Sequence, residues 1–221
     1  LNGLAKLSEN GKMAIIQNGS PLFNGDAGSG PSNIRKYILE NDWLEAIIQL
    51  STDMFMNTGI STYIWILNKN KPESRAGKVQ LIDASHCFEP RRKSIGTKRN
   101  DITDLCRELI TKAYGEFRSG AVYGEKDGVY CESKIFDSEE FGYNKITVVM
   151  PKLDENGKPV FDKKGKPVAG ETDTENVPLT QDIDEYFERE VKPYAPDAWI
   201  DKKKTKVGYE IPMTRYFYEY Q

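Results

Sequence analysis

Residues 41–71 read NDWLEAIIQLSTDMFMNTGISTYIWILNKNK and contain two apolar runs separated by a polar loop. The runs Leu44–Leu50 and Thr62–Leu67 are short and rich in isoleucine, so each predicts a buried strand. Met13–Gln17 and Val79–Ile82 have the same apolar character and predict two more strands. Strands this apolar are typical of a sheet covered on both faces, which predicts an α/β fold with a largely parallel sheet.

The spacing of these runs adds detail to the predicted sheet. The interval between Thr62–Leu67 and Val79–Ile82 is too short for a crossover helix, so we expect an antiparallel hairpin there. Helices are predicted over Asn33–Glu40 and Ile102–Phe117. In the second helix one apolar stripe is formed by Ile102, Leu105, Cys106, Leu109, Ile110 and Ala113. We expect this helix to close a first domain, residues 1–118.

The sequence changes character after Ser119, where short β-like pieces alternate with turns. We therefore assign residues 119–221 to a smaller α+β region. Within it, DENGKPVFDKKGKPV (154–168) carries Gly-Lys-Pro-Val twice with a period of eight, which predicts an exposed hairpin. Thr180–Val191 predicts an acidic helix.

The composition limits the function classes. The 221 residues carry a net charge of -3, so any surface that binds nucleic acid must be a local basic patch. The three cysteines, Cys87, Cys106 and Cys131, are widely spaced and form no CxxC pair, which favours free thiols in a reducing cytoplasm. With His86 as the single histidine, we expect no metal site. No apolar run approaches the roughly 20 residues that a membrane span needs, so we expect no membrane contact.

Three glycines lie in GDAGSGPSN (25–33), just before a predicted helix. A P-loop needs Lys and Ser or Thr after its last glycine, and a dinucleotide fingerprint needs a third glycine where Asn33 stands. The pattern favours a flexible loop that ends at Ser32 or Asn33 as the helix N-cap, with Arg35 and Lys36 on the exposed face. A role facing the substrate stays open, because ligands of α/β sheets bind beyond the carboxyl ends of strands.

Ser20–Phe23, SPLF, differs by one residue from the [Asp/Asn/Ser]-Pro-Pro-[Tyr/Phe] motif of methyltransferases that act on amino groups. That motif holds the amine in line with the methyl donor. Because Leu22 stands where the motif has its second proline, we interpret this segment as a later part of such a fold.

Long strings of the sequence resemble one family closely. They are residues 41–71, the preceding GKMAIIQNGSPLFNGDAGSGPSNIRKYIL, the following GKVQLIDAS, and then KSIGTKRNDIT, FGYNKITVVMP and REVKPYAPDAWIDKKKTKVGYEIPMTRYFYEY. These strings are similar to the methylation subunit of type I restriction–modification systems, which are adenine-specific DNA methyltransferases. The resemblance implies the back half of a Rossmann-like sheet, S-adenosylmethionine as the cofactor, and DNA, a specificity subunit and a restriction subunit as partners.

The chain also departs from this family. The family's glycine-rich cofactor loop and its Asn-Pro-Pro-[Tyr/Phe] catalytic motif lie upstream of the matching region, and neither string occurs here. We therefore expect a fragment whose upstream part is missing, with no catalytic or cofactor-binding residues and no methyl transfer by itself. The alternative is a non-catalytic module that docks a partner subunit.

Phe55 is the residue that the resemblance singles out. MFMNTGIST (54–62) is similar to the segment of adenine methyltransferases in which an aromatic ring packs against the extruded target base. Asn57, Thr58 and Gly59 are interpreted as the turn that aims the following strand. The alternative is that Phe55 only fills the edge of the sheet.

Two basic clusters are candidates for contact with DNA phosphates. The first has five cations and no acid in a predicted loop: Arg91, Arg92, Lys93, Lys98 and Arg99. The second, Lys202–Lys204 with Lys206, lies beside Trp199 and Tyr209 and suits either DNA or an acidic protein.

Aromatic residues are dense near the end of the chain. They are Tyr194, Trp199, Tyr209, Tyr216, Phe217, Tyr218 and Tyr220. Aromatic side chains dominate interface energies, so this density favours a docking surface. A small second core is the alternative.

Overall fold

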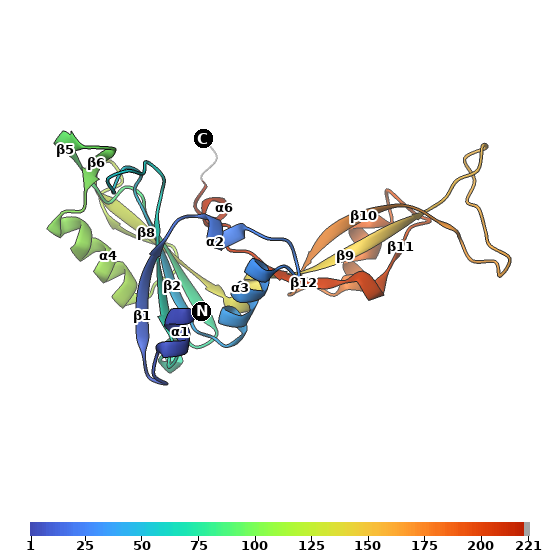
Figure 1. Cartoon of the computed structure of the whole chain (residues 1–221), viewed down its shortest axis with the longest axis horizontal. Coiled ribbons are helices and arrows are strands. Elements are labelled where there is room, and N and C mark those ends of the chain that lie inside the picture. Colours follow the sequence, from blue (N-terminus) through green and yellow to red (C-terminus); the bar gives the residue numbers. More distant parts are fainter. Residues whose placement is uncertain (219–221) are drawn as a thin grey trace. The chain divides into compact units, whose positions relative to one another are not determined.

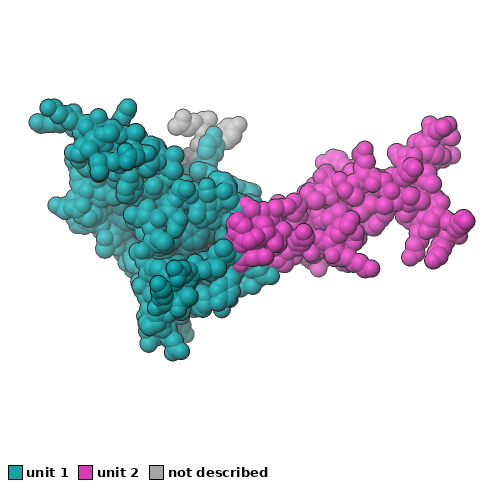
Figure 2. All heavy atoms as spheres, viewed as in Figure 1, with its two compact units in different colours: residues 1–24, 34–138, 210–221 teal, residues 25–33, 139–209 magenta. Residues whose placement is uncertain are grey.

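The structure is a computed structural model that describes residues 1–218, and the chain forms two compact units (Figure 2). Unit 1 contains Leu1–Asn24, Ile34–Ser138 and Glu210–Gln221, and unit 2 contains Gly25–Asn33 and Glu139–Tyr209. The boundary predicted after residue 118 therefore falls inside unit 1. The reason is a β-hairpin over 121–137, which adds two strands to the sheet of unit 1.

Unit 1 is built on a six-stranded sheet with the order β1-β3-β2-β4-β8-β7, of which Figure 1 labels β1, β2 and β8. The strands are β1 (Lys12–Gln17), β2 (Leu44–Leu50), β3 (Tyr63–Asn68), β4 (Lys78–Ala84), β7 (Ala121–Gly124) and β8 (Tyr130–Asp137). The central strands β2, β3 and β4 confirm three of the predicted runs. β2 is buried at every residue except the half-buried Gln49, as expected for a strand covered on both faces.

The pairing of these strands differs from the prediction. Only β2 and β4 are parallel, and the other four pairs are antiparallel, so the expectation of a largely parallel sheet was wrong. The expected hairpin between β3 and β4 was also wrong, because β2 lies between them. Since β3 and β4 run in opposite directions on either side of β2, their short connection stays at one end of the sheet and needs no crossover helix.

Strand β1 is the edge of the sheet within residues 1–218 and pairs there with β3. Its side chains are exposed or half-buried, and Ile16 is 51% exposed. The strand predicted over Met13–Gln17 is therefore confirmed, but its predicted burial was wrong. Apolar composition indicates a strand that favours burial, but it does not say which strands lie at the edge.

The helical segments of unit 1 are short apart from two. They are α1 (Asn2–Lys6), α2 (Ser20–Phe23), the 3₁₀ turn η1 (Glu73–Arg75), α4 (Asp104–Glu116) and α6 (Met213–Phe217), and α3 (Gly30–Glu40) begins in unit 2 and continues into unit 1. α4 begins where Thr103 caps the backbone N–H of Cys106, and it packs across β4, β8 and β7. The predicted apolar stripe is confirmed at Cys106 and Ala113, whereas Leu105 is exposed.

Helix α3 begins earlier than predicted. Ser32 and Asn33 lie inside its first turn, so the prediction that one of them caps the helix was wrong. Arg35 is 2% exposed, which also contradicts its predicted place on the exposed face. Its guanidinium donates hydrogen bonds to the backbone oxygens of Pro21, at 3.1 Å, and Asn24, at 2.8 Å. Arg35 therefore satisfies carbonyl groups at the end of α2 that would otherwise lack a donor.

A buried carboxylate organises one end of the sheet in unit 1. Glu45 on β2 is 1% exposed and accepts hydrogen bonds from Lys12, at 3.2 Å, from Asn68, at 2.5 Å, and from the Tyr114 hydroxyl. Arg75 lies 3.6 Å from the same carboxylate. Burial acts to raise the pKa of Glu45, but the hydrogen bonds outweigh it and the pKa is lowered.

The closing segment, residues 210–217, returns to unit 1 after unit 2 is complete. Ile211 is fully buried, and its N–H donates to the backbone oxygen of Leu22 at 2.9 Å. Lys134 on β8 donates to the backbone oxygen of Tyr216 at 2.7 Å. Unit 1 therefore contains segments from both ends of the described chain.

Unit 2 is built on β9 (Gly142–Pro151), which pairs with three other strands. The partners are β10 (Ala169–Pro178), β11 (Trp199–Ile200) and β12 (Lys206–Tyr209). The 3₁₀ turn η2 (Ser138–Phe141) precedes β9. A helix begins at α5 (Ile183–Tyr186), continues as a π-helical turn over Phe187–Val191, and confirms the helix predicted over 180–191. The core of this unit contains Ile146, Val148, Val177, Phe187 and Ala198.

The repeat between β9 and β10 forms two small exposed turns, which confirms the predicted hairpin character. The bridges Leu153↔Pro159 and Phe161↔Pro167 close the two turns. In the first turn the Asp154 carboxylate accepts the N–H groups of residues 156 and 158, and Asp162 does the same for residues 164 and 166. The period of eight therefore reflects one turn built twice.

Candidate nucleic-acid interface

The loop that follows β2 presents Phe55 at the surface of unit 1. Phe55 pairs with Thr58 in an isolated bridge, and Asn57 between them has a φ of +77°, which marks a tight turn. The Phe55 side chain is 38% exposed and that of Met56 is 56% exposed. Met56 and Asn57 thus form the turn, Thr58 closes it and Gly59 follows it, and the role of Asn57, Thr58 and Gly59 in aiming β3 stays a prediction.

The first basic cluster lies on a β-hairpin, β5 (Glu89–Ile95) and β6 (Lys98–Asp101), where we predicted a loop. The hairpin was missed because its strands carry charges in place of an apolar period. Gly96 at the tip has a φ of +60°, which allows the reversal between Ile95 and Lys98. The cations are therefore displayed on a paired ribbon.

The five cations of this hairpin fall into two groups. Arg91 and Lys98 both form ion pairs with Asp101, and the hydrogen bond from Lys98 lowers the pKa of that carboxylate. Within residues 1–218 the side chains of Arg92, Lys93 and Arg99 have no acidic partner. The second group therefore keeps its full charge for an external anion.

Hydrogen bonds join the Phe55 loop to the basic hairpin. The Thr97 hydroxyl lies 3.2 Å from the backbone oxygen of Phe55 and donates to it. The backbone N–H of Arg99 donates to the oxygen of Asp53 at 2.9 Å, and the Asn100 amide donates to the oxygen of Thr52, also at 2.9 Å. Two sets of predicted site residues that are far apart in the sequence are thus brought together.

Sequence reasoning missed the residues that make this connection. Thr97 and Asn100 are small polar residues whose role depends on distant backbone oxygens, so no local pattern indicates it. Met56, Ile60 and Ile95 are also exposed on the two joined segments. Large apolar side chains inside a polar loop are the one signal that would have pointed to them.

The second basic cluster is partly neutralised inside unit 2. Lys202 pairs with Asp184 at 2.9 Å, and Lys204 pairs with Asp201 at 3.5 Å. Tyr209 beside it is 4% exposed and belongs to the core. This cluster therefore offers less free positive charge than the hairpin, and its role stays a prediction.

The glycine-rich loop at residues 25–33 is closely packed by side chains of unit 2. Gly28 has a φ of +80°, and a Cβ there would lie 3.2 Å from the Lys206 side chain. A Cβ at Gly25 would collide with the Ser29 hydroxyl. Asp26 in the same loop accepts a hydrogen bond from Lys145, which lowers the pKa of Asp26. The loop thus packs on itself and on two lysines.

The cysteines are free thiols that contribute to the core of unit 1. Cys87 donates a hydrogen bond to the backbone oxygen of Tyr130 at 3.1 Å, and the His86 ring stacks on that of Tyr130 at 4.6 Å. Among residues 1–218 no three His, Cys, Asp or Glu side chains are grouped so that they could hold a metal ion. The described helices include none with the length and apolar character to cross a membrane.

The aromatic residues of the last segment serve different units. Tyr209 is buried at the end of β12, whereas Tyr216 contacts Phe136 on β8 of unit 1, with ring centroids 4.2 Å apart. Tyr194 and Tyr218 are strongly exposed. Tyr220 lies outside the described residues. The choice between a docking surface and a second core therefore differs from residue to residue.

Comparisons with known proteins agree with the resemblance noted in the sequence. Residues 1–146 match the profile of the N-6 DNA Methylase family. The methylase subunit of the type I restriction enzyme MjaVIII from Methanocaldococcus jannaschii is 36% identical over 135 residues, and the MjaVII methylase subunit of the same organism is 44% identical over 133 residues. Each alignment covers 60% of this chain and 21% of the relative, so the chain spans only a small part of these proteins.

A solved structure supports the fold. The methyltransferase subunit of a type I restriction–modification system from Streptococcus thermophilus matches with a TM-score of 0.51 and 29% identity, over 63% of this chain and 26% of that one. The α/β class and the Rossmann-like methyltransferase fold expected from the resemblance are confirmed. With a family profile that spans 146 of its 221 residues, this chain belongs to the N-6 DNA methylase family.

Proposed function

We propose that this chain is part of an adenine-N6 DNA methyltransferase that uses S-adenosylmethionine within a type I restriction–modification complex. Its partners in that complex are DNA, a DNA-specificity subunit and a restriction subunit. Family membership and the names of the similar proteins support this proposal. The single observation that carries the DNA-facing part is the hydrogen-bonded union of the Phe55 loop with the basic hairpin.

Phe55 stacks on the target adenine after the base has left the duplex. The ring is accessible, and the Thr97 hydroxyl fixes the backbone that carries it. Stacking of a base on an aromatic side chain contributes about 1–3 kcal/mol, which offsets a large part of the cost of unstacking. Asn57 supports the loop within the turn that the bridge from Phe55 to Thr58 closes, and Gly59 follows this turn.

The hairpin holds the DNA backbone beside this loop. Arg92, Lys93 and Arg99 contact phosphates, since no acidic side chain among the described residues competes for them. Arg91 and Lys98 contribute less, because Asp101 already pairs with both. Phosphate contacts fix the position of DNA without reading its sequence.

Methyl transfer requires residues beyond this segment. The glycine-rich loop is packed against Ser29 and Lys206, which does not fit cofactor binding, and SPLF (20–23) forms a helical turn with Leu22 buried. The chain by itself therefore acts in positioning DNA and not in catalysis.

The test uses a full-length methylase subunit that carries this segment, assembled with its specificity subunit. Phe55→Ala should weaken binding to DNA with a mismatched target adenine by about 1–3 kcal/mol and leave cofactor affinity unchanged. Phe55→Trp keeps a stacking face and should retain most of the affinity. Ile60→Ala is the matched control, because Ile60 is exposed on the same loop. Equal losses for Phe55→Ala and Ile60→Ala, or unfolding without a specific effect on the target base, would contradict the proposal.

A further inference from the structure

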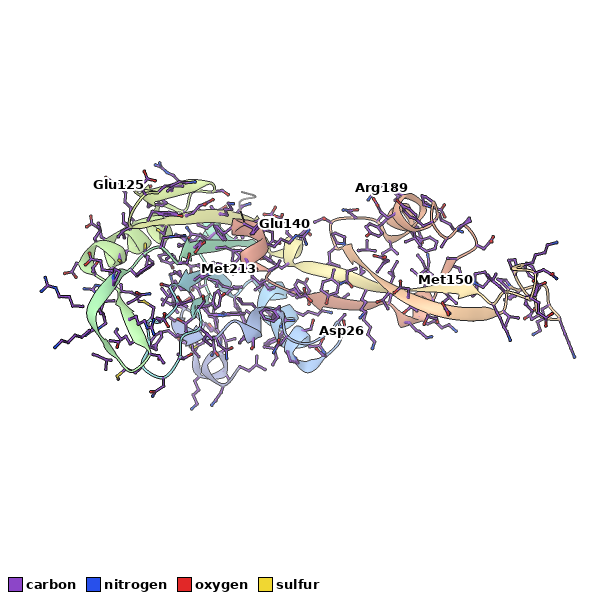
Figure 3. The ribbon with its side chains drawn as sticks, turned by 90° about the horizontal axis from the view of Figure 1, so that it is seen from above. Asp26, Glu125, Glu140, Met150, Arg189 and Met213 are labelled. Atoms are coloured by element: carbon purple, nitrogen blue, oxygen red, sulfur yellow. The ribbon has the colours of Figure 1, made fainter. Side chains whose placement is uncertain are left out.

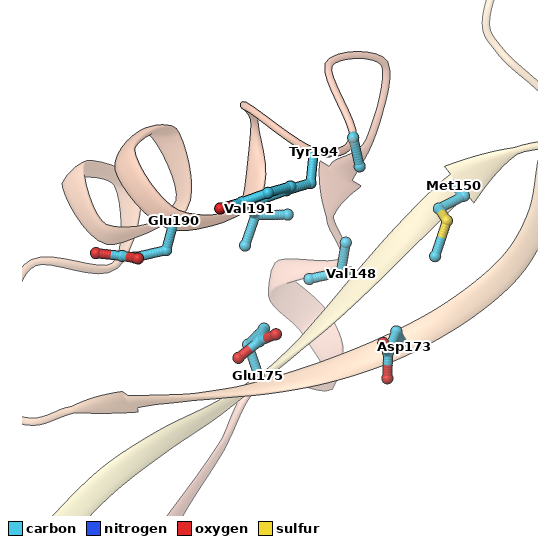
Figure 4. A pocket seen from close by; sticks show the side chains of 8 residues that line it. Val148, Met150, Asp173, Glu175, Glu190, Val191 and Tyr194 are labelled. Atoms are coloured by element: carbon cyan, nitrogen blue, oxygen red, sulfur yellow. The ribbon is translucent and has the colours of Figure 1, made fainter.

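A cavity of about 280 Å³ lies within unit 2, between the sheet and the helical segment that follows β10 (Figure 4). Its floor is apolar and is formed by Val148 and Met150 of β9 together with Val191 and Ala195. Figure 3 labels Met150 on β9 and Arg189 on the helical segment. Nothing in this cavity belongs to the candidate nucleic-acid interface, which is in unit 1.

The apolar lining of the cavity belongs to the partly exposed edge of the core of unit 2. Val148 is buried in the core of unit 2, whereas Met150, Val191 and Ala195 pack against that core and stay partly exposed. Covering such partly exposed apolar surface with another apolar group lowers the free energy of the system. The methylene groups of a long side chain are sufficient for this. Lysine and arginine bury these groups on apolar surface while the charged group stays in polar surroundings.

The rim of the cavity is acidic. Glu190 pairs with Arg189 at 2.7 Å, but Asp173 and Glu175 of β10 have no cationic partner among residues 1–218. The negative potential extends to Tyr186, where burial and then the charges of Glu175 and Glu190 raise the pKa. An anion such as a phosphate is therefore disfavoured here, and a cation is favoured.

An aromatic ring stands at the mouth of the cavity. Tyr194 is 89% exposed, and Figure 4 shows its ring beside Val191, on the side of the cavity opposite Asp173 and Glu175. The face of an aromatic ring attracts a cation, and a guanidinium stacks on it more readily than an ammonium. The exposed ring, the apolar lining and the two carboxylates thus favour one kind of ligand, a flat cation on an apolar stem.

We propose that this cavity receives an arginine side chain from a partner polypeptide. The methylene stem covers Met150 and Val191, the guanidinium plane stacks on Tyr194, and its N–H groups pair with Asp173 and Glu175. Arginine is favoured over lysine because its planar fork pairs with carboxylates and is weakly hydrated. This inference stands apart from DNA methylation, since it concerns a protein contact on the other unit.

The test follows the methionine methyl groups of the 221-residue chain by NMR after labelling with ¹³C-methyl methionine. The probe is N-acetyl-L-arginine amide, and N-acetyl-L-citrulline amide is the neutral control of the same shape. We expect a saturable shift of the Met150 signal, assigned with Met150→Leu, and roughly tenfold weaker binding of the citrulline probe. Met13 and Met213, which lie in unit 1, report whether the effect is local.

Variants test the contributions of the carboxylates and of the aromatic ring separately. The double change Asp173→Asn/Glu175→Gln should remove the preference for arginine, and Tyr194→Ala should weaken arginine binding while Tyr194→Phe preserves it. Unchanged Met13 and Met213 signals show that the variants remain folded. Equal affinities for the two probes, or no Met150 shift at saturating probe, would overturn the proposal, as would parallel shifts of all methionines.

Discussion

Neutralising the free cations of the β5–β6 hairpin should flatten the salt dependence of DNA binding. Arg92, Lys93 and Arg99 have no acidic partner among the described residues. Each cation that contacts a phosphate contributes about 0.9 to the slope of log affinity against log salt, so three contacts contribute roughly 2.7. The triple change Arg92→Gln, Lys93→Gln and Arg99→Gln should therefore reduce the slope by about that amount.

The control is on the same hairpin. Changing Arg91→Gln, Lys98→Gln and Asp101→Asn removes two cations and one anion that are already paired with one another. The net change is one charge, so the slope should fall by no more than about 0.9. Because the backbone N–H of Arg99 still bonds to Asp53, neither set of changes removes the connection to the Phe55 loop.

The assay is fluorescence anisotropy with residues 1–221 and two duplexes of unrelated sequence, between about 50 and 200 mM salt. Both duplexes should lose affinity in parallel, since phosphate contacts do not read the bases. An unchanged slope in the free-cation variant would show that these side chains are only solvated. Equal slope changes in the two variants would refute the distinction between paired and free cations, and a loss limited to one duplex would mean that the hairpin reads bases.

Three further predictions concern the chain itself. Isothermal titration should detect no micromolar binding of S-adenosylmethionine to residues 1–221, and no methyl group should enter DNA; either signal would contradict the proposal that catalysis needs a longer chain. Glu45→Gln should lower the free energy of unfolding by about 2 kcal/mol near neutral pH. Because the folded pKa of Glu45 is lowered, this contribution is present above the unfolded value and is lost as pH falls through the folded value, so urea unfolding should show the difference shrinking in acid; a constant difference would refute it. Gly124→Ala should destabilise unit 1 by about 1–3 kcal/mol more than Gly120→Ala in thermal unfolding, because both have positive φ but only a Cβ at Gly124 collides with the backbone oxygen of Val129; equal costs would contradict this.

The secondary structure could be predicted from the sequence where the side chains are strongly buried. β2, β3 and β4 appear as apolar runs, and α4 as an apolar stripe after Thr103. The pairing of the strands could not be predicted, because an apolar run indicates burial but not which strand lies beside it. The exposed strand β1 shows this limit, since its isoleucines predict burial that no described element provides on its outer edge.

Only parts of the candidate site could be predicted from the sequence. Phe55 and the five cations could each be singled out, one from the resemblance and the others from local charge. Their proximity depends on the Thr97 hydroxyl and on backbone hydrogen bonds to residues 52 and 53, which leave no sequence pattern. The division of the cations by Asp101 likewise depends on the hairpin register, and charged strands give no apolar period from which to predict it.

The closing segment at residues 210–217 has a consequence for synthesis of the protein on the ribosome. The sheet of unit 1 is translated by residue 138, yet the partners of Leu22 and Lys134 emerge only after Glu139–Tyr209. At typical elongation rates of about 5–20 residues per second, this delay lasts roughly 4 to 14 seconds. During that time the nascent unit lacks the hydrogen bond from Ile211 to Leu22 and the buried side chains of Ile211 and Met213, so apolar surface that they would contact is transiently exposed. A premature stop codon within unit 2 would therefore release a chain whose first unit lacks these contacts.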